Sequence, residues 1–462
     1  MSSKPRIPKG TRDFNSQQIA KREYIFNTIK SNFNKFGFTP IETPSFELSE
    51  TLLGKYGNEG DRLIFKILNS GEKVKKADLK ALKNNEFFNF SNSVSEKALR
   101  YDLTVPFARY VVQNQNEITF PFKRYQIQPV WRADRPQRGR FQEFYQCDAD
   151  VVGSKSLLQE IEFIQLYDSV FSDLKLEGVS VKINNRKILS GIAELIGADN
   201  KITDFTVALD KLDKIGIELV KDEMLKKGIS SKSIDTMQPI FDLSGDFNSK
   251  LDSLKTILAD SEIGKVGISE LEWIFNTITE LGLKKIKFEF DVTLARGLNY
   301  YTGSIIEVSP PKGVSMGSIG GGGRYDDLTG IFGLKGVSGV GISFGLDRIA
   351  LILEELGLFP NLNYQSTQIL FSNFGYQESI YCLKSIRRLR EFGIIAELYP
   401  DAVKLKKQIS YANKKDIPYV ALVGDEEIKQ NKITLKKMSD SSQKILGINE
   451  LIKMFACQNL KI

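Results

Sequence analysis

The stretch WRADRPQRGRFQEFYQCDAD, residues 131–150, gives the clearest indication of how this chain folds. Apolar and polar residues alternate on either side of its centre, which predicts two strands, at 122–132 and 141–152. The residues between these strands, 134–140, are polar and include a proline and a glycine. We therefore predict an antiparallel hairpin with a long, basic connecting loop.

The second predicted strand carries a polar face. Gln146, Asp148 and Asp150 alternate along it and point to one side, with Phe144 further back on the same side. Two carboxylates and an amide are costly inside a core, so this face either lines a ligand site or is an exposed face of a sheet. The arginines of the connecting loop are suited to contact phosphates.

Histidine is absent from all 462 residues of the sequence. This excludes a Ser-His-Asp or Cys-His relay and any zinc site with histidine ligands. Catalysis must therefore use carboxylates, arginines, hydroxyls, backbone amides or a metal held by oxygen. The three cysteines lie far apart without CxxC spacing, which indicates reduced thiols. The sequence has no secretory signal and no apolar run of about 18 residues, so we expect a soluble, cytoplasmic protein with no membrane partner.

The chain divides into four parts by composition. Residues 187–284 carry lysine, aspartate and leucine at helical spacing, and we predict a helical insertion domain that interrupts a core of residues 1–186 and 285–357. Residues 358–366 are the clearest linker. Residues 367–462 alternate apolar runs with helical segments, which predicts a small α/β unit with parallel strands. This last part has 16 Lys and Arg against 10 Asp and Glu, so it either faces a polyanion or is a well-solvated basic surface. A further segment, at 70–97, is rich in lysine, asparagine and serine, and we expect an exposed loop or excursion there.

Two further clusters carry groups suited to binding. Asp102 and Thr104 would point to one face of an extended segment and could hold a primary ammonium, although a surface strand end with a capping aspartate is the simpler explanation of this cluster alone. Arg296 stands beside a glycine, which lets a guanidinium approach a phosphate closely. Tyr300 and Tyr301 follow it and offer hydroxyls and ring faces to a planar ligand.

Two glycine-rich segments complete the set. Residues 320–323 are four glycines, which permit close backbone approach or form a flexible turn, and Arg324 follows them; no Walker A motif occurs. Residues 339–348 predict a glycine-rich strand that enters a helix. Arginines at 132, 296, 324 and 348 together suggest phosphoryl or nucleotidyl transfer by positional and electrostatic catalysis.

These motifs resemble the histidyl-tRNA synthetases, a family of class II aminoacyl-tRNA synthetases, over nearly the whole chain. The segments that carry the resemblance are PKGTRDF at 8–14, the motif 1 region at 37–46, RYDLTVP at 100–106, the motif 2 hairpin at 131–150, LARGLNYYTG at 294–303 and motif 3 at 339–348. Motif 3 alone indicates only the class, whereas 294–303 together with 100–106 is specific to this family.

The resemblance implies an α+β fold. In this fold an antiparallel sheet core is flanked by helices, the helical insertion precedes motif 3, and the C-terminal α/β unit is an anticodon-binding domain. It also implies a homodimer and the activity of a histidine–tRNA ligase, which forms histidyl-adenylate from L-histidine and ATP with Mg²⁺ and transfers it to the 3′ end of tRNA(His).

The resemblance also implies roles for individual residues. The catalytic arginines on the α-phosphate are Arg132 and Arg296. Histidine is bound by Asp102, Leu103, Thr104, Gln146, Asp150, Tyr300 and Tyr301, beside a wall formed by the glycines 320–323. ATP is bound by Arg132, Asp134, Phe144 and Arg348, and the tRNA acceptor end is contacted by Arg135, Gln137 and Arg138. The ligands of Mg²⁺ are not indicated. The sequence departs from the family pattern at Asp134, where glutamate is usual, and at Asn299, where aspartate is common.

Two related kinds of protein compete with this interpretation. The first is a non-catalytic, histidine-binding regulatory paralogue of histidine biosynthesis. Such paralogues lack the anticodon domain and usually lose catalytic arginines, whereas residues 367–462, Arg132 and Arg296 are all present here. The second is a sensor of uncharged tRNA, which is attached to further domains that this chain has no room for. We therefore expect a synthetase.

Overall fold

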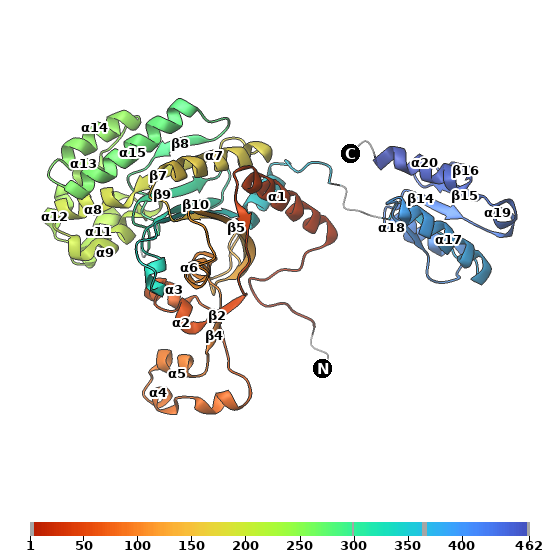
Figure 1. Ribbon diagram of the computed structural model, residues 1–462, viewed down its shortest axis with the longest axis horizontal. Helices are drawn as coiled ribbons and strands as arrows, with labels where there is room; N and C mark the ends of the chain where they lie inside the picture. Colours follow the sequence, from red (N-terminus) through yellow and green to blue (C-terminus); the bar gives the residue numbers. More distant parts are fainter. Residues whose placement is uncertain (1–3, 298–299, 363–366, 460–462) are drawn as a thin grey trace. The chain divides into compact units, whose positions relative to one another are not determined.

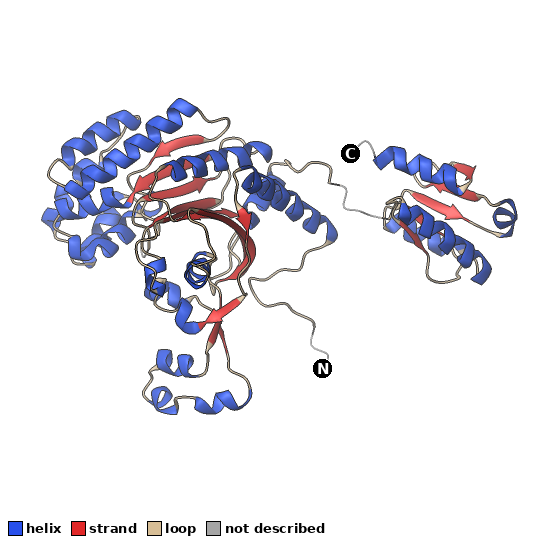
Figure 2. Cartoon of the chain, viewed as in Figure 1, coloured by secondary structure: helices blue, strands red, loops and turns tan. Residues whose placement is uncertain are grey.

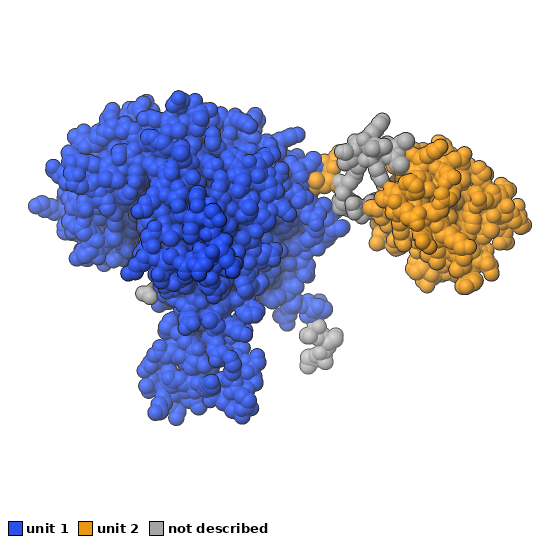
Figure 3. All heavy atoms as spheres, in the orientation of Figure 1, with its two compact units in different colours: residues 1–360 blue, residues 361–462 orange. Residues whose placement is uncertain are grey.

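The structure is a computed structural model that describes residues 4–297, 300–362 and 367–459. It forms two compact units, Met1–Pro360 and Asn361–Ile462, which are coloured separately in Figure 3. The division falls within the predicted linker 358–366, of which residues 363–366 lie outside the described part. We call these the first unit and the second unit.

The first unit is built on an eight-stranded sheet. Its strands, in spatial order, are β1 (Thr39–Pro40), β5 (Phe122–Trp131), β6 (Glu143–Val152), β11 (Gly339–Gly345), β10 (Gly320–Tyr325), β9 (Ser304–Ser309), β7 (Ser180–Asn185) and β8 (Lys287–Phe290). All pairs from β5 to β7 are antiparallel, and only the outermost pairs, β1–β5 and β7–β8, are parallel. The predicted antiparallel sheet core is confirmed.

The predicted hairpin is strands β5 and β6. Each strand is shorter than predicted by one or two residues, and the register pairs Val130 with Phe144 and Arg124 with Asp150. Figure 2 shows the long strands of the sheet curving around helix α6 (Thr104–Gln113).

Helices pack on the sheet through an apolar core. Helix α1 (Ser16–Lys35) buries Ile25, Ile29 and Phe33, which lie four residues apart and therefore on one side of the helix. The Phe33 ring lies 5.2 Å from that of Tyr125 on β5 and 5.9 Å from that of Phe344 on β11. Helices α7 (Leu158–Asp173) and α16 (Leu346–Glu355) contribute to the same core.

The segment predicted as a helical insertion is helical. Its helices are α8 (Arg186–Leu195), α9 (Ile202–Leu209), α10 (Leu212–Ile215), α11 (Ile217–Lys226), α12 (Ser231–Thr236), α13 (Gln238–Phe241), α14 (Phe247–Ile257) and α15 (Glu262–Leu281). Helices α8 and α15 cross at glycines, because a Cβ on Gly191 would lie 2.8 Å from the Cα of Gly264. The buried apolar side chains of these helices belong to the same core as those of the sheet, and Figure 1 shows the helices beside strands β7 and β8.

The segment at 70–97 was predicted as an exposed loop or excursion; it is an excursion, but it is helical rather than a loop. It contains the turn of 3₁₀-helix η1 (Gly71–Lys76) and helices α4 (Leu79–Lys83) and α5 (Phe87–Ser93), and it projects from the sheet in Figure 1. The strands at its base, β3 (Lys66–Ile67) and β4 (Lys97–Leu99), form a small sheet with β2 (Phe46–Leu48). Local capping explains the helices, since the Asp78 carboxylate accepts hydrogen bonds from the N–H groups of Lys80 and Ala81.

The second unit is a five-stranded sheet with helices. The strands, in spatial order, are β13 (Ala396–Leu398), β12 (Ile369–Phe371), β14 (Tyr419–Leu422), β15 (Ile433–Lys437) and β16 (Gln443–Leu446), and the helices are α17 (Tyr376–Glu391), α18 (Leu405–Lys414), α19 (Asp425–Gln430) and α20 (Ile448–Asn459). The first three strands are parallel, as predicted, whereas β15 and β16 add antiparallel pairs that were not predicted. Among the described residues of the chain, no helix has the length and apolar character needed to span a membrane.

Candidate active site

Two cavities of the first unit gather most of the predicted site residues. The large cavity, of about 590 Å³, and the small cavity, of about 90 Å³, share a wall formed by Asp102, Arg132, Gln146, Tyr300 and Tyr301. The predicted site residues that line one or both cavities are Asp102, Thr104, Arg132, Asp134, Phe144, Gln146, Asp150, Arg296, Tyr300, Tyr301 and Arg348. The other four line neither cavity: Leu103, Arg135, Gln137 and Arg138.

Arg132 is held in place at the junction of the two cavities. Its Nε donates a hydrogen bond of 3.0 Å to the carbonyl of Tyr101, and its Nη2 lies 3.4 Å from Oε1 of Gln146. The guanidinium lies 4.3 Å from the ring centre of Tyr101. Because its orientation is already fixed, this cation can stabilise a developing negative charge without reorganising.

Arg296 also lines the large cavity. Its guanidinium forms an ion pair with Glu307 on β9, and its side chain remains 44% exposed. Gly297 follows with φ +67°, and a Cβ there would lie 1.8 Å from the Tyr301 ring. The turn therefore requires glycine, which places Tyr301 directly against the backbone beside Arg296. Residues 298 and 299, including the departure at Asn299, lie outside the described part of the chain.

Arg348, in the first turn of α16, is the third cation of the large cavity. It donates hydrogen bonds of 2.8 Å to the carbonyl of Gly139 and 2.5 Å to that of Ser318. Burial lowers the pKa of Arg348, and the nearby Arg140, Arg296 and Arg132 lower it further. Such mutual repulsion is relieved by an anion, so this region is suited to a polyphosphate.

The N-terminal part of the chain contacts the residues around Arg348. Asp347 precedes Arg348, and its Oδ1 accepts hydrogen bonds of 2.5 Å from both Arg12 and Arg22. The Arg12 guanidinium also lies 3.3 Å from the ring centre of Phe141, which lines the large cavity. These contacts join residues more than 300 positions apart in the sequence, with separations of 335 and 325.

The small cavity begins at Asp102. This buried carboxylate accepts hydrogen bonds from the Tyr56 hydroxyl at 2.8 Å and from the Val105 N–H at 3.2 Å. Burial raises the pKa of Asp102, which the Tyr56 hydroxyl and the positive charge of Arg132 oppose. Asp102 and Thr104 were expected on one extended strand, and this was wrong, because helix α6 begins at Thr104. Both still line the small cavity, since the carboxylate caps the first turn of that helix.

The polar face of β6 forms the floor of the small cavity. The Asp150 carboxylate lies 2.8 Å from Nη2 of Arg124 on β5 and accepts a 2.6 Å hydrogen bond from the Tyr325 hydroxyl. Gln146 lies 3.2 Å from Oγ of Ser343 on β11 and 3.4 Å from Oδ1 of Asp148. The prediction that Gln146, Asp148 and Asp150 share one face is confirmed, and that face lines a cavity.

The four glycines at 320–323 are strand β10 rather than a flexible turn. A Cβ on Gly322 would lie 2.2 Å from the carbonyl oxygen of Gly341 on the neighbouring strand. A Cβ on Gly341 would lie 1.9 Å from Oδ1 of Asp150. Glycine is needed at both positions because the strands and the Asp150 carboxylate approach one another so closely.

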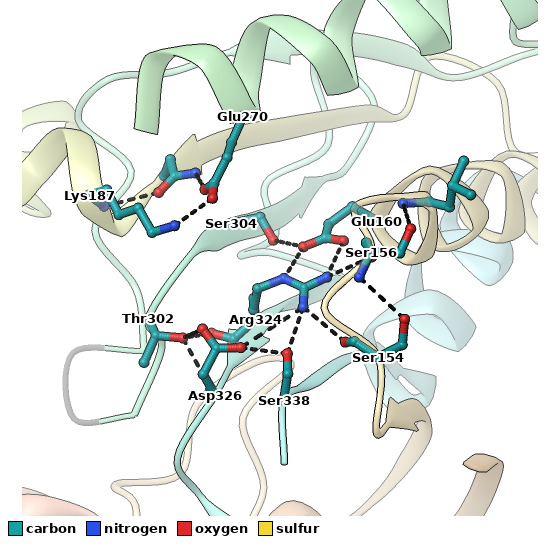
Figure 4. Close-up of polar contacts among 12 residues, drawn as sticks. Ser154, Ser156, Glu160, Lys187, Glu270, Thr302, Ser304, Arg324, Asp326 and Ser338 are labelled. Atoms are coloured by element: carbon teal, nitrogen blue, oxygen red, sulfur yellow. Dashed lines mark hydrogen bonds and ion pairs between the residues drawn. The ribbon is translucent and has the colours of Figure 1, made fainter. Parts of the chain in front are cut away.

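Arg324 does not belong to the site, so its grouping with the other three arginines was wrong. Its guanidinium forms two hydrogen bonds of 2.6 Å with the fully buried Glu160 on α7 and one of 2.7 Å with Ser338 (Figure 4). Neither cavity is lined by Arg324. The pair fastens the end of β10 to helix α7, and a sequence motif cannot separate such a structural arginine from a catalytic one.

The four predicted site residues that line neither cavity lie in the core or in the hairpin loop. Leu103 is fully buried, and only its backbone stands between Asp102 and Thr104. Gln137 exchanges backbone hydrogen bonds with Arg140 in the hairpin loop. Arg135 is exposed in this loop, and Arg138 forms an ion pair with Glu355 of α16.

Sequence reasoning missed four residues of the site. They are Tyr56, Arg124, Tyr325 and Ser343. Arg124 faces Asp150 in the hairpin register, so a known register would have revealed it. No sequence signal pointed to Tyr56, because it comes from a separate segment of the chain.

Comparisons with known proteins identify two family profiles and several similar sequences. A family profile described as "Histidyl-tRNA synthetase" matches residues 78–349, and one described as "Anticodon binding domain" matches residues 371–458. The chain is 66% identical over 451 residues to a histidine–tRNA ligase of Christiangramia forsetii, covering 98% of this chain and 99% of the relative. It is 60% identical over 461 residues to that of Flavobacterium johnsoniae, covering 96% and 97%.

Solved structures are similar over the same extent. The crystal structure of histidyl-tRNA synthetase from Nostoc sp. PCC 7120 matches with a TM-score of 0.77 and 29% identity, covering 99% of this chain and 100% of that one. A structure described as an ATP phosphoribosyltransferase regulatory subunit/histidyl-tRNA synthetase from Bacillus halodurans has a TM-score of 0.69 at 19% identity and covers 88% and 97%. The latter likeness concerns the fold alone.

Proposed function

Because the chain belongs to the histidyl-tRNA synthetase family, we propose that its two cavities together activate L-histidine with ATP and pass it to tRNA(His). The family, the fold class and the ligase activity agree with what the sequence predicted. The observation that carries the assignment to this site is the division of charge. Arg296 and Arg348 line only the large cavity, Asp148 and Asp150 line only the small one, and Arg132 lies between them.

In the first step the carboxylate of histidine attacks the α-phosphate of ATP. A bond forms between a carboxylate oxygen and phosphorus, and the bond to the leaving pyrophosphate breaks. The carboxylate is already ionised at neutral pH, so no general base is needed, and the absence of histidine from the chain poses no difficulty. Arg132 and Arg296 approach from opposite sides and stabilise the charge of the transition state.

Histidine is bound in the small cavity. Asp102, Thr104 and Gln146 hold its α-ammonium, with the Leu103 backbone between the first two. Asp150 and Tyr301 contact the imidazole, with Tyr300 beside them. The position of these side chains around one small space supports this arrangement, since Tyr300 and Tyr301 lie with ring centres 4.5 Å apart.

ATP is bound in the large cavity. Phe144 and Arg348 enclose the adenine by stacking and cation–π contact. Asp134 contacts the nucleotide less closely than a glutamate would, because its side chain is one methylene shorter. Both Phe144 and Arg348 line the large cavity, which supports their roles.

Transfer uses the hairpin loop and the second unit. Arg135, Gln137 and Arg138 contact the acceptor end of tRNA, for which Arg138 exchanges its ion pair with Glu355 for a phosphate. The terminal ribose hydroxyl attacks the acyl carbon to form an ester, the bond between that carbon and the phosphate oxygen breaks, and AMP leaves with the hydroxyl proton on its phosphate. The second unit, with its basic composition, binds the anticodon stem.

Mg²⁺ accompanies ATP in this proposal. Among the described residues, no group of three or more carboxylate or cysteine side chains is arranged to hold a metal. Mg²⁺ commonly binds through substrate phosphates and one or two carboxylates, so this site accepts the ion with its nucleotide. The bound ion would neutralise phosphate charge.

The domain boundaries, the dimer and the location are further parts of the proposal. The core is 1–186 with 285–357, the insertion is 187–284, the linker is 358–366 and the anticodon domain is 367–462. The chain works as a homodimer in the cytoplasm. Phe46, the last residue of the motif 1 region, and Leu48, just after it, are 47% and 51% exposed, as expected of side chains that a second copy covers. Analytical ultracentrifugation tests the dimer, and a monomer at micromolar concentration would contradict it.

Histidine-dependent exchange of pyrophosphate into ATP tests the function. We expect exchange with histidine and none with other amino acids, and its loss in Arg132→Ala and in Arg296→Ala. Arg135→Ala is the matched control, because it removes an exposed arginine of the acceptor-binding loop: exchange should persist while tRNA charging falls. Binding of histidine without exchange in the unaltered protein would identify a regulatory paralogue instead.

A further inference from the structure

Asp148 is a buried carboxylate without a cation. It is 3% exposed, on the floor of the small cavity between Gln146 and Asp150. Among the described residues, no lysine or arginine nitrogen lies within 4.0 Å of it, whereas its neighbour Asp150 has Arg124 at 2.8 Å. Its carboxylate accepts hydrogen bonds from the Ser343 side chain and, at 3.4 Å, from the Gln146 amide, and neither donor carries a charge. A buried charge of this kind is costly unless a ligand supplies the opposite charge.

The charges around the small cavity show which ligand group is missing. The proposed function assigns Arg132 to the carboxylate of histidine and Asp102 to its ammonium. Arg124 already neutralises Asp150. Asp148 is then the one carboxylate of this cavity to which no cation of the protein or of the substrate is assigned, and it lies beside Asp150, where the ring of histidine is placed.

We propose that Asp148 is a specificity residue that selects histidine with its ring protonated, so that the bound substrate carries an imidazolium opposite the Asp148 carboxylate. The inference rests on the proposed function, because it concerns the same pocket and substrate. An imidazolium donates a hydrogen bond from each ring nitrogen, which suits a floor made of two carboxylates. The Asp148 carboxylate also disfavours amino acids whose side chains are of similar size but neutral, since these would leave its buried charge without an opposite charge.

The surroundings of Asp148 agree with this assignment. The charged and titratable groups around it are Arg124 on β5, Cys147 and Asp150 on β6, Tyr167 on α7, Asp102 before α6, and Arg132, Tyr300, Tyr301 and Tyr325 around the cavity. Burial raises the pKa of Asp148 to about 7, Asp150 and Asp102 act in the same direction, and Arg124 opposes them. The free pocket therefore lacks positive charge at Asp148, and the substrate ring can supply it.

Binding then takes up a proton at mildly alkaline pH. The ordinary pKa of an imidazole is about 6.5, so at about pH 8 free histidine has a neutral ring and Asp148 is ionised. The bare ring nitrogen gains one proton from the solvent as the complex forms. A proton placed on Asp148 instead, with a neutral ring, would give the same uptake, so uptake alone does not locate the proton.

Nuclear magnetic resonance locates it directly, because the chain contains no histidine and every imidazole signal belongs to the ligand. We would add histidine labelled with ¹³C and ¹⁵N to the full-length protein at about pH 8. Signals from bound histidine test the proposed function first. We expect similar chemical shifts for the two ring nitrogens, the mark of a doubly protonated ring. Dissimilar shifts, which indicate one bare nitrogen, would overturn the inference while leaving the synthetase function intact.

An Asp148→Asn variant tests the residue itself. We expect its KM for histidine in pyrophosphate exchange to rise by roughly thirtyfold, since one partner of a buried charge pair is lost. Its preference for histidine over 1,2,4-triazole-3-alanine, whose ring is neutral at this pH, should also narrow, which a purely structural role would not cause. Asp173→Asn is the control, because it makes the same change in a carboxylate 44% exposed at the end of α7. An unchanged preference in a folded Asp148→Asn protein would contradict the assignment.

Discussion

The Arg124 guanidinium lies 2.8 Å from the Asp150 carboxylate, and both side chains are buried. The two residues face each other in the β5–β6 register, and the guanidinium also lies 4.0 Å from the ring centre of Phe107 on α6. Asp150 is therefore fixed in position and neutralised before any substrate arrives. A carboxylate held in this way can act as a hydrogen-bond acceptor of fixed geometry.

Breaking this pair should destabilise the first unit. Arg124→Met keeps most of the side-chain volume but leaves Asp150 charged and buried, which should lower the free energy of unfolding by about 3–5 kcal/mol. Urea unfolding can be followed by the fluorescence of Trp131 and Trp273, the chain's two tryptophans, both in the first unit. Lys123→Met is the control on the same strand, because Lys123 and Glu162 are partly exposed and their pair contributes at most about 1 kcal/mol. Equal losses in the two variants would contradict the prediction.

Asp148 should make the free protein less stable as pH rises. Its pKa is raised from 3.8 in the unfolded chain to about 7 in the folded one, mainly by burial. Between these values the folded chain keeps a proton that the unfolded chain has lost, so the free energy of unfolding falls as pH increases and levels off above pH 7. From about pH 5 to pH 8 the contribution amounts to about 3 kcal/mol.

Asp148→Asn removes this dependence. We expect the variant to be more stable than the unaltered chain at about pH 8 and similar to it at about pH 5, by urea unfolding without histidine. The comparison isolates one group, because every other carboxylate is common to both proteins. Parallel pH profiles would show that Asp148 does not titrate as described. Residues that bind substrate in an active site commonly lower the free energy of unfolding of the free protein.

Gly341→Ala should impair histidine binding as well as stability. The new Cβ would lie 1.9 Å from Oδ1 of Asp150, so the carboxylate must move away from the cavity. We expect a rise in the KM for histidine of roughly tenfold or more in pyrophosphate exchange, with a smaller change in the KM for ATP. Gly424→Ala in the second unit is the control, because its Cβ would meet only the flexible end of Glu427, at 3.3 Å. Equal changes in the KM values for histidine and ATP would show that the substitution does not act specifically on the histidine-binding cavity.

Metal binding should depend on the nucleotide. The described residues offer no cluster of three metal ligands, so the free protein should leave added Mn²⁺ free in solution, as read by electron paramagnetic resonance. Addition of ATP should produce a bound signal, and chelation should abolish pyrophosphate exchange. Tight Mn²⁺ binding without ATP would show that the protein itself supplies a complete site.

The two steps of the reaction should separate on truncation. Both cavities lie within residues 1–360, so a chain ending at Pro360 should retain histidine-dependent exchange. It should lose most of its charging of tRNA, because the basic second unit is missing. Loss of exchange, with unfolding unchanged by fluorescence, would show that the second unit is needed for the first step.

The sequence was informative where periodicity or a local motif controls the structure. Strands β5 and β6 alternate with period two, so both their limits and the face shared by Gln146 and Asp150 could be predicted. The helices of the insertion were also predictable, because their lysine, aspartate and leucine residues recur at helical spacing. The segment at 100–104 was predicted as extended because two polar residues two apart suit a strand, yet a helix begins at Thr104, and the Asp102 carboxylate accepts a hydrogen bond from the Val105 N–H in its first turn.

Contacts between distant segments were not predictable. The partner of Asp150 depends on the hairpin register, which an eleven-residue connection, 132–142, leaves undetermined from sequence. Arg324 resembled the site arginines in its glycine-rich setting, and only its contacts with Glu160 reveal a structural role. Tyr56 reaches Asp102 from another part of the chain, with no motif to announce it.

The ion pairs of Asp347 with Arg12 and Arg22 have a consequence for synthesis on the ribosome. Helix α1 emerges among the first residues, but the carboxylate that anchors it is added more than 300 residues later. Throughout most of translation the apolar side of α1 therefore has no completed sheet to cover, because β10 and β11 are also made late. The nascent chain must keep this helix from aggregating until the end of the first unit has been made. The nucleotide side of the site is thus completed only after residue 347 has been added. A chain whose synthesis ends before that residue lacks this part of the site.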